Sequence, residues 1–153
     1  METSVRSKFE ITFLDETGNL VGDPNRQDVS NAIPVLDIII CPPGATQDNG
    51  VHCKALVDTG ADYTVASYDL VNRLNAKYLR TVMNSGVNGT VETTLHDMTF
   101  YLTATDGHQL KVESDIVLNQ HPNTAYPVII GRSTFRHGTL LLDYRAGLFE
   151  FIV

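Results

Sequence analysis

Short runs of valine, isoleucine, leucine and threonine recur along the chain, and glycine, asparagine, aspartate and proline separate them. This pattern is typical of β-strands that are joined by turns. Residues 35–41 and 128–130 are apolar almost throughout, as expected of strands that are covered on both faces. We therefore predict an all-β fold with a buried sheet.

The turn residues divide the chain into hairpins and short connections. Phe9, Ile11 and Phe13 alternate with polar residues, which predicts an N-terminal hairpin at residues 8–22. The segment 66–74 favours a short helix, for which Ser67 is a candidate N-cap. The remaining predicted elements are strands at 51–57, 98–104 and 110–118, a helical turn at 132–136 and a C-terminal hairpin at 139–153.

A further hairpin is predicted at residues 77–95, with a turn at 84–89 that contains Gly86 and Gly89. Glycines at the tip and β-branched residues in the arms suit a mobile covering flap. An ordinary surface hairpin would have the same pattern. On this segment alone, the ordinary surface hairpin is the better interpretation.

The size and charge of the chain exclude several classes of function. Its 153 residues suffice for one domain with a real core. The formal net charge of -7 disfavours nucleic acid as a partner, because an acidic surface repels phosphate. The N-terminus lacks the apolar core of a signal peptide and no apolar run reaches membrane-spanning length, so we expect a cytoplasmic protein without a membrane partner.

The residues that commonly bind metals or form disulfides show no grouping of that kind. Cys41 and Cys53 are too few for a disulfide framework, and we expect two free thiols. The five histidines lack the spacing of a metal site. No metal and no cofactor are therefore expected.

The clearest candidate for chemistry is the segment 55–65, in which an apolar run delivers Asp58 to a tight turn. We expect Gly60 to adopt a backbone conformation that other residues avoid, and the Thr59 hydroxyl to anchor the loop. We interpret Asp58 as the catalytic carboxylate of an aspartic protease. The chain contains no second Asp-Thr-Gly and no repeat of this region that would indicate a second lobe.

Two motifs in this order resemble the retropepsins, the single-lobe aspartic proteases of retroviruses. They are Leu56-Val57-Asp58-Thr59-Gly60-Ala61-Asp62 and Val128-Ile129-Ile130-Gly131-Arg132, with the glycine-tipped hairpin between them. The resemblance covers residues 33–144 and implies a closed β-barrel with one or two short helices. It also implies a single domain over residues 1–153 and a two-fold homodimer, in which each subunit lends one aspartate to a shared site.

The resemblance implies a role for each matching residue. Asp58 is the catalytic acid, Thr59 holds the two active-site loops together across the dimer, and Gly60 contacts the substrate backbone. Ala61 and Asp62 line the substrate-binding wall. Asp62 also forms a structural salt bridge with Arg132, and the flap tip consists of Gly86, Val87, Asn88 and Gly89. The C-terminal hairpin is similar to that of Ddi-like and bacterial relatives, which implies that residues 148–153 contribute to the dimer interface.

These inferences predict a homodimeric aspartic endopeptidase that hydrolyses polypeptides with a water molecule held between two Asp58 carboxylates under a flap. An alternative is a catalytically inactive or weak module of the same fold that dimerises or binds peptides. Phosphoryl transfer through Asp58 is a third reading, but the chain has no Asp-x-Asp pattern to hold magnesium.

Overall fold

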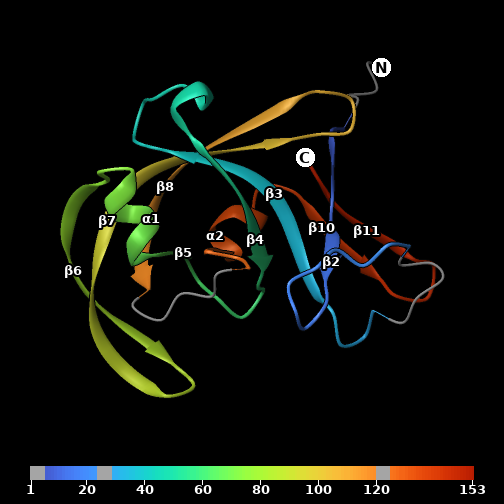
Figure 1. Ribbon diagram of the computed structural model, residues 1–153, viewed down its shortest axis with the longest axis horizontal. Coiled ribbons are helices and arrows are strands. Elements are labelled where there is room, and N and C mark those ends of the chain that lie inside the picture. The colour runs from blue at the N-terminus through green and yellow to red at the C-terminus, as the bar shows by residue number, and fades with distance from the viewer. Residues whose placement is uncertain (1–5, 24–28, 120–124) are drawn as a thin grey trace.

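The computed structural model describes residues 6–23, 29–119 and 125–153. The described chain is mostly β, with two short α-helices and one 3-10 turn (Figure 1). The elements are β1 (Lys8–Glu10), β2 (Thr12–Leu14), β3 (Ile33–Cys41), η1 (Gln47–Asn49), β4 (Val51–Val57), β5 (Thr64–Ser67), α1 (Tyr68–Arg73), β6 (Lys77–Gly86), β7 (Gly89–Thr103), β8 (Gln109–Asn119), β9 (Val128–Ile130), α2 (Arg132–Phe135), β10 (Thr139–Asp143) and β11 (Leu148–Ile152).

The larger sheet closes on itself and forms a barrel. Its strand order is β2-β3-β4-β9-β5-β8-β7-β6, and a further pairing of β3 with β7 joins two strands that lie far apart in this order. The ring therefore runs through β3, β4, β9, β5, β8 and β7, while β2 and β6 remain outside it. This arrangement confirms the predicted closed barrel, and closure leaves the ring strands without free edges.

The second sheet brings the two ends of the described chain together. Its order is β1-β11-β10, so β11 is the central strand and pairs with a neighbour on each side. Two backbone hydrogen bonds extend the β1–β11 pairing by one residue. The Ser7 N–H donates to the Val153 carbonyl oxygen at 2.8 Å, and the Val153 N–H donates to the Ser7 carbonyl oxygen at 3.0 Å. Both edges of residues 148–152 are therefore already paired. A dimer interface cannot form by pairing of this strand with a second chain.

The predicted N-terminal hairpin at 8–22 is shorter in the structure. The chain changes sheets at Ile11, because β1 pairs with β11 whereas β2 pairs with β3. The turn that follows is closed by the bridge between Leu14 and Leu20 and by a hydrogen bond from the Val21 N–H to the Phe13 carbonyl oxygen at 2.8 Å. The alternation of Phe9, Ile11 and Phe13 correctly indicated three buried side chains, but a pattern of burial does not specify the partner strand.

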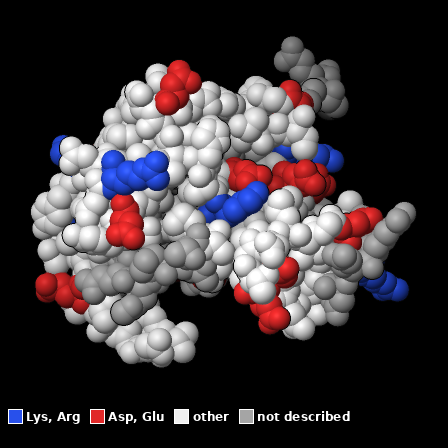
Figure 2. All heavy atoms as spheres, viewed as in Figure 1, with Lys and Arg blue, Asp and Glu red and all other residues white. Residues whose placement is uncertain are grey.

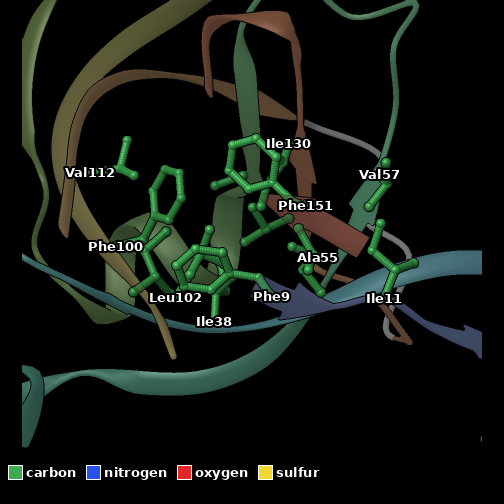
Figure 3. Packing of buried hydrophobic residues seen from close by; sticks show 14 of the residues in the cluster. Phe9, Ile11, Ile38, Ala55, Val57, Phe100, Leu102, Val112, Ile130 and Phe151 are labelled. Carbon is green, nitrogen blue, oxygen red and sulfur yellow. The ribbon is translucent and has the colours of Figure 1, made fainter. Parts of the chain in front are cut away.

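The core fills the interior of the barrel and the space between the barrel and the second sheet. Figure 3 shows side chains from β1, β3, β4, β7 and β11 converging on one cluster. Phe151 lies at its centre and stacks edge-on against Phe135, with ring centroids 5.4 Å apart. Burying an aromatic side chain of this size contributes roughly 2–3 kcal/mol. The C-terminal strand is therefore an integral part of the fold.

The short helices lie close to their predicted positions. The α1 helix begins after Ser67, whose hydroxyl accepts a hydrogen bond from the Leu70 N–H at 3.4 Å, so the predicted N-cap is confirmed. The α2 helix occupies residues 132–135 and follows β9 directly. None of the helices in the described part of the chain is long and apolar enough to cross a membrane.

The hairpin at 77–95 is part of a longer structure. The return arm, β7, continues without interruption from residue 89 to residue 103, so the separate strand predicted at 98–104 is its second half. The turn contains only Val87 and Asn88, which lie between the paired Gly86 and Gly89. Its shortness is explained by Gly89, whose φ of 107° suits a type I turn followed by a left-handed glycine.

Candidate active site

Asp58 lies immediately after β4, where two neighbouring strands fix its position. β4 pairs antiparallel with β3 and parallel with β9. The backbone N–H of Asp58 donates to the carbonyl oxygen of Ile130 at 3.1 Å, so β9 holds the first residue of the loop. The side chain of Asp58 is partly buried, while Thr59 and Gly60 are exposed. A buried strand thus presents one carboxylate at an open loop.

The loop orients the carboxylate through its own backbone. The Gly60 N–H donates to Asp58 Oδ1 at 2.8 Å, and the Ala61 N–H donates to the Asp58 carbonyl oxygen at 3.3 Å. We expected Gly60 to adopt a backbone conformation that other residues avoid. This prediction is wrong, because the φ angle of Gly60 is not positive. A Cβ atom at this position would lie 3.1 Å from Asp58 Oδ1, which is closer than ordinary contact, so a larger residue would press on the carboxylate.

Arg132 connects the two ends of the active-site loop. Its Nη1 donates to the Thr59 carbonyl oxygen at 2.7 Å, and its Nη2 forms an ion pair with the Asp62 carboxylate. The backbone of the same residue donates to the Ala61 carbonyl oxygen at 2.9 Å. The planar guanidinium thus uses both arms on one loop, which an ammonium group could not do with the same geometry.

Gly131 allows this close approach of β9 and α2 to the loop. A Cβ atom at Gly131 would lie 2.5 Å from the Tyr63 carbonyl oxygen and 2.6 Å from that of Ala61. Because both of these neighbours are backbone atoms, a larger residue would displace the loop. The second sequence motif therefore supports the first one physically, and the structure brings residues 58–62 and 130–132 into one contact network.

Thr59 differs from its neighbours because its side chain faces solvent without a hydrogen-bond partner among the described residues. Its carbonyl oxygen is held by Arg132, which fixes the backbone beneath the hydroxyl group. This hydroxyl group is held in position and has no partner, so it can both donate and accept a hydrogen bond.

The glycine-tipped hairpin extends away from the barrel. Figure 1 shows the tip of β6 and β7 and the loop after β4 both directed toward the lower edge of the view. The tip is open to solvent, since Val87 is fully exposed and nothing outside the adjoining residues lies within 4 Å of the Cβ positions of Gly86 and Gly89. The hairpin exposes Met83 (64%), Val91 (59%) and a fully exposed Val87. These apolar side chains have no surface to cover within the chain.

The base of this hairpin contains a cluster that the sequence did not indicate. His96 Nδ1 lies 3.3 Å from the Ala76 carbonyl oxygen, and its Nε2 lies 2.8 Å from the Thr94 hydroxyl. Because a carbonyl can only accept, Nδ1 carries the proton of the neutral ring. Tyr78 stacks edge-on against the same ring, and the β6–β7 register shifts between Tyr78 and Arg80. No local motif marks this cluster.

Two cavities lie among the described residues, and Asp58 lines neither of them. One of about 360 Å³ lies beside Tyr63, between α2 and the β7–β8 pair. Another of about 180 Å³ lies where β1 meets β3 and β7. Among the described residues, no group of histidine, cysteine and acidic side chains could hold a metal ion.

The two cysteines do not face each other across β3 and β4. Cys53 pairs in register with Ile38, whereas Cys41 lies beyond the residues that pair with β4 and is opposite Thr99 of β7. Both thiols are free. Burial raises the pKa of Cys53 to about 12, and it also raises the pKa of Cys41. Both therefore stay protonated and contribute no nucleophile to the site.

Comparison with solved structures supports the architecture. EIAV protease in complex with the inhibitor HBY-793 matches with a TM-score of 0.51 and 22% identity, over 76% of this chain and 98% of that one. A retropepsin-like aspartic protease from Rickettsia conorii matches with a TM-score of 0.51 and 14% identity, over 99% of this chain and 96% of that one. At these identities the likeness shows the fold, which is retropepsin-like.

A search of curated proteins found no match. A family model described as aspartyl protease, however, matches residues 45–133. This range is more than half of the chain. It includes β4, the Asp58 loop, the glycine-tipped hairpin and Arg132, which holds the loop. The chain therefore belongs to the aspartyl protease family and has a retropepsin-like fold.

Proposed function

We propose that the protein is a homodimeric aspartic endopeptidase whose catalytic residue is Asp58, one from each subunit. The observation that carries this proposal is the loop itself. It holds a single, partly buried carboxylate by a hydrogen bond from the Gly60 N–H and is fastened at both ends by Arg132. Such preorganisation has a purpose in catalysis, where a carboxylate must be positioned before substrate arrives.

A second subunit is required because aspartic protease chemistry uses two carboxylates. The chain has one Asp-Thr-Gly and no repeated lobe. Thr59 is exposed and has an unused hydroxyl beside the carboxylate, so it can bond to the partner's loop across a two-fold axis. This arrangement places the two Asp58 side chains together and buries a loop that is open in the single chain.

The three-stranded sheet offers a surface for dimerisation. Since β11 is central, β1 and β10 are the edges of this sheet, and each pairs only with β11 among the described residues. The Lys8 carbonyl oxygen of β1 already accepts a hydrogen bond from the Thr105 N–H at 3.0 Å, so β10 is the more open edge. An unpaired strand edge readily pairs with another chain. In the proposed dimer the β10 strands of two subunits lie antiparallel, so residues 148–153 contribute through their neighbour.

The mechanism follows from two carboxylates held close together. Like charges at this distance cannot both ionise easily, so the pair retains one proton. The ionised group accepts a proton from a water molecule, which attacks the peptide carbonyl, and the protonated group donates to the developing oxyanion. A proton then passes to the leaving nitrogen. No step requires a residue outside the two loops.

The substrate in this proposal is an extended polypeptide. The hairpin β6–β7 acts as the flap, and its exposed strands can bind a peptide by backbone hydrogen bonds as an added strand. One side of the substrate contacts the hairpin tip, which consists of Gly86, Val87, Asn88 and Gly89. The opposite side contacts the Asp58 loop at Gly60, Ala61 and Asp62. Closing of the flap would exclude bulk water and cover the exposed Val87 and Val91.

The test compares the wild-type protein with Asp58→Asn on a peptide library between acidic and neutral pH. We expect cleavage by the wild type and a loss of about a thousandfold or more in the variant, because asparagine cannot exchange the proton. Asp48→Asn, an exposed change in η1, is the matched control and should retain activity. Cleavage that persists in Asp58→Asn would remove Asp58 from the mechanism, and peptide binding without cleavage by either protein would favour the binding module.

The proposal also predicts how activity depends on pH. Activity should fall as the pH rises above neutral, because the pair loses its shared proton. The measurement is kcat/KM for one peptide across the range in which the protein stays folded. A rate that continues to rise in alkaline solution would contradict a proton-sharing pair.

A further inference from the structure

The tip of the flap contains a dipeptide with chemistry of its own. Asparagine followed by glycine occurs at two places in the chain, Asn49-Gly50 and Asn88-Gly89. In such a pair the backbone nitrogen of glycine can attack the side-chain carbonyl carbon of asparagine, because glycine has no Cβ to obstruct the approach. The two sites are chemically identical, so their surroundings decide which one reacts.

The first site is locked by its surroundings. The Gly50 N–H, which would be the nucleophile, donates to the Gln47 carbonyl oxygen at 3.0 Å within η1. A Cβ atom at Gly50 would collide with the Ile39 side chain, so the glycine is packed against β3. Asn49 therefore reacts only after local opening of this structure, which lowers its rate.

The second site is open on all sides. Asn88 and Gly89 are exposed, and no atom lies within 4 Å of the Cβ position of Gly89 or of Gly86. The pair Gly86–Gly89 is the last one of the hairpin, so it frays more easily than any pair nearer the barrel. The Asn88 side chain has room to rotate toward the nitrogen of Gly89.

We propose that Asn88 is a site of spontaneous deamidation that modifies the flap of the native protein. The Gly89 nitrogen forms a bond to Asn88 Cγ, the Cγ–Nδ2 bond breaks, and ammonia leaves with the proton of the Gly89 N–H. Water then opens the resulting succinimide at either carbonyl carbon. The products are aspartate and isoaspartate, and water is the only co-reactant.

The modification changes the flap where it is most sensitive. Residues 81–91 carry no charged side chain, and Figure 2 shows an uncharged hairpin tip at the lower left of the surface. Each event adds one negative charge, and isoaspartate also lengthens the backbone by one methylene group. Either product disturbs the turn and the strand-like contacts of the tip. The loss of substrate binding that follows rests on the proposed function, whereas the chemistry does not.

The experiment follows both sites in one sample. The native protein is kept in mildly alkaline buffer, and trypsin then separates Asn49, in peptide 27–54, from Asn88, in peptide 81–111. Fragment masses locate the exchange of an amide group for a hydroxyl group. We expect Asn88 to convert about tenfold faster than Asn49, the factor that corresponds to about 1.4 kcal/mol of local opening.

Two controls show whether the structure causes the difference. Asn88→Gln should abolish conversion at the tip, and Asn84, which precedes a serine in the same peptide, should remain largely intact. In denaturant the rates at Asn49 and Asn88 should become similar. Equal rates in the native protein, or a difference that persists in denaturant, would overturn the assignment.

The functional consequence has a separate readout. Peptide binding is measured on Asp58→Asn, which cannot turn over the peptide, before and after ageing and beside an Asp58→Asn, Asn88→Asp double variant. We expect a several-fold loss of affinity in proportion to the converted fraction, and a greater loss for acidic peptides than for neutral ones. Unchanged affinity after full conversion would overturn the effect on the flap. Failure of fresh protein to bind any peptide would instead count against the proposed function, while the mass analysis still tests the modification.

Discussion

At the scale of single residues, the site depends on contacts that reach only a few ångströms. Arg132 holds both the Thr59 carbonyl oxygen and the Asp62 carboxylate, although its own side chain is 56% exposed. An exposed ion pair contributes at most about 1 kcal/mol to folding. The contribution of Arg132 therefore lies in the shape of the loop.

We predict that Arg132→Lys separates activity from stability. Lysine keeps the charge but cannot bond to both loop positions, so the carboxylate of Asp58 shifts while the fold remains. Peptide cleavage should fall about tenfold or more, with a change of about 1 kcal/mol or less in the free energy of unfolding. Lys54→Arg, in the exposed pair with Asp37, is the control and should alter neither. A parallel loss of stability and activity would contradict the prediction.

A second prediction at this scale concerns the thiols. Since burial raises the pKa of Cys53 to about 12, its reactive thiolate is scarce at neutral and mildly alkaline pH. Alkylation of native protein at pH values near 8 should label Cys53 and Cys41 far more slowly than alkylation in denaturant, as seen by mass spectrometry. Rapid labelling of the folded protein would show that β3 and β4 open locally.

At the scale of elements, the glycine-tipped hairpin, which is the proposed flap, is joined to the barrel through the His96 cluster. The hydrogen bond between His96 and the Ala76 carbonyl oxygen connects β7 with the residue before β6, next to the register shift, whereas the hydrogen bond between His96 and Thr94 lies within β7. Beyond this cluster, most side chains of β6 are exposed. The hairpin thus has one fastened end and one free end, which is the geometry of a hinged cover.

We predict that His96→Phe loosens the flap selectively. Phenylalanine can still pack on Tyr78, but it loses both hydrogen bonds, each worth about 1 kcal/mol. Hydrogen exchange of the β6 amides should accelerate, whereas exchange in β3 and β4 should not. His108→Phe, in the exposed turn between β7 and β8, is the matched control. Acceleration spread evenly over the barrel would indicate a general loss of stability and no hinge.

At the scale of the whole molecule, the open loop and the free β10 edge belong to one proposal, the dimer. Activity per subunit should decline on dilution, because separate subunits hold one carboxylate each. Leu141→Lys places a positive charge on β10, and two such charges would meet near a two-fold axis. We expect sedimentation to show weaker dimerisation with unchanged circular dichroism, and no effect from Thr105→Lys. An unaffected dimer would place the interface elsewhere.

The sequence predicted local features well because these depend on neighbours in the chain. The strand at 51–57, the Ser67 N-cap and the final hairpin all follow from period and turn residues. The pairing of β3 with β7 and the parallel pairing of β4 with β9 could not be predicted, because alternation specifies a buried face and not a partner. The reason for Gly60 was likewise out of reach, since it depends on the position of the Asp58 carboxylate.

The central position of β11 also determines when the chain can become folded. Phe151 is fully buried, and its strand pairs with β1 on one side and with β10 on the other. On the ribosome, the barrel strands emerge long before residues 148–152, so an incomplete chain carries an open core and an unpaired β1. Joining residues as distant as Lys8 and Ile152 is also slow, because the loop that closes is long. Nascent chains are therefore expected to depend on chaperones until synthesis passes this strand, and in the proposed dimer the shared site could not act before that moment.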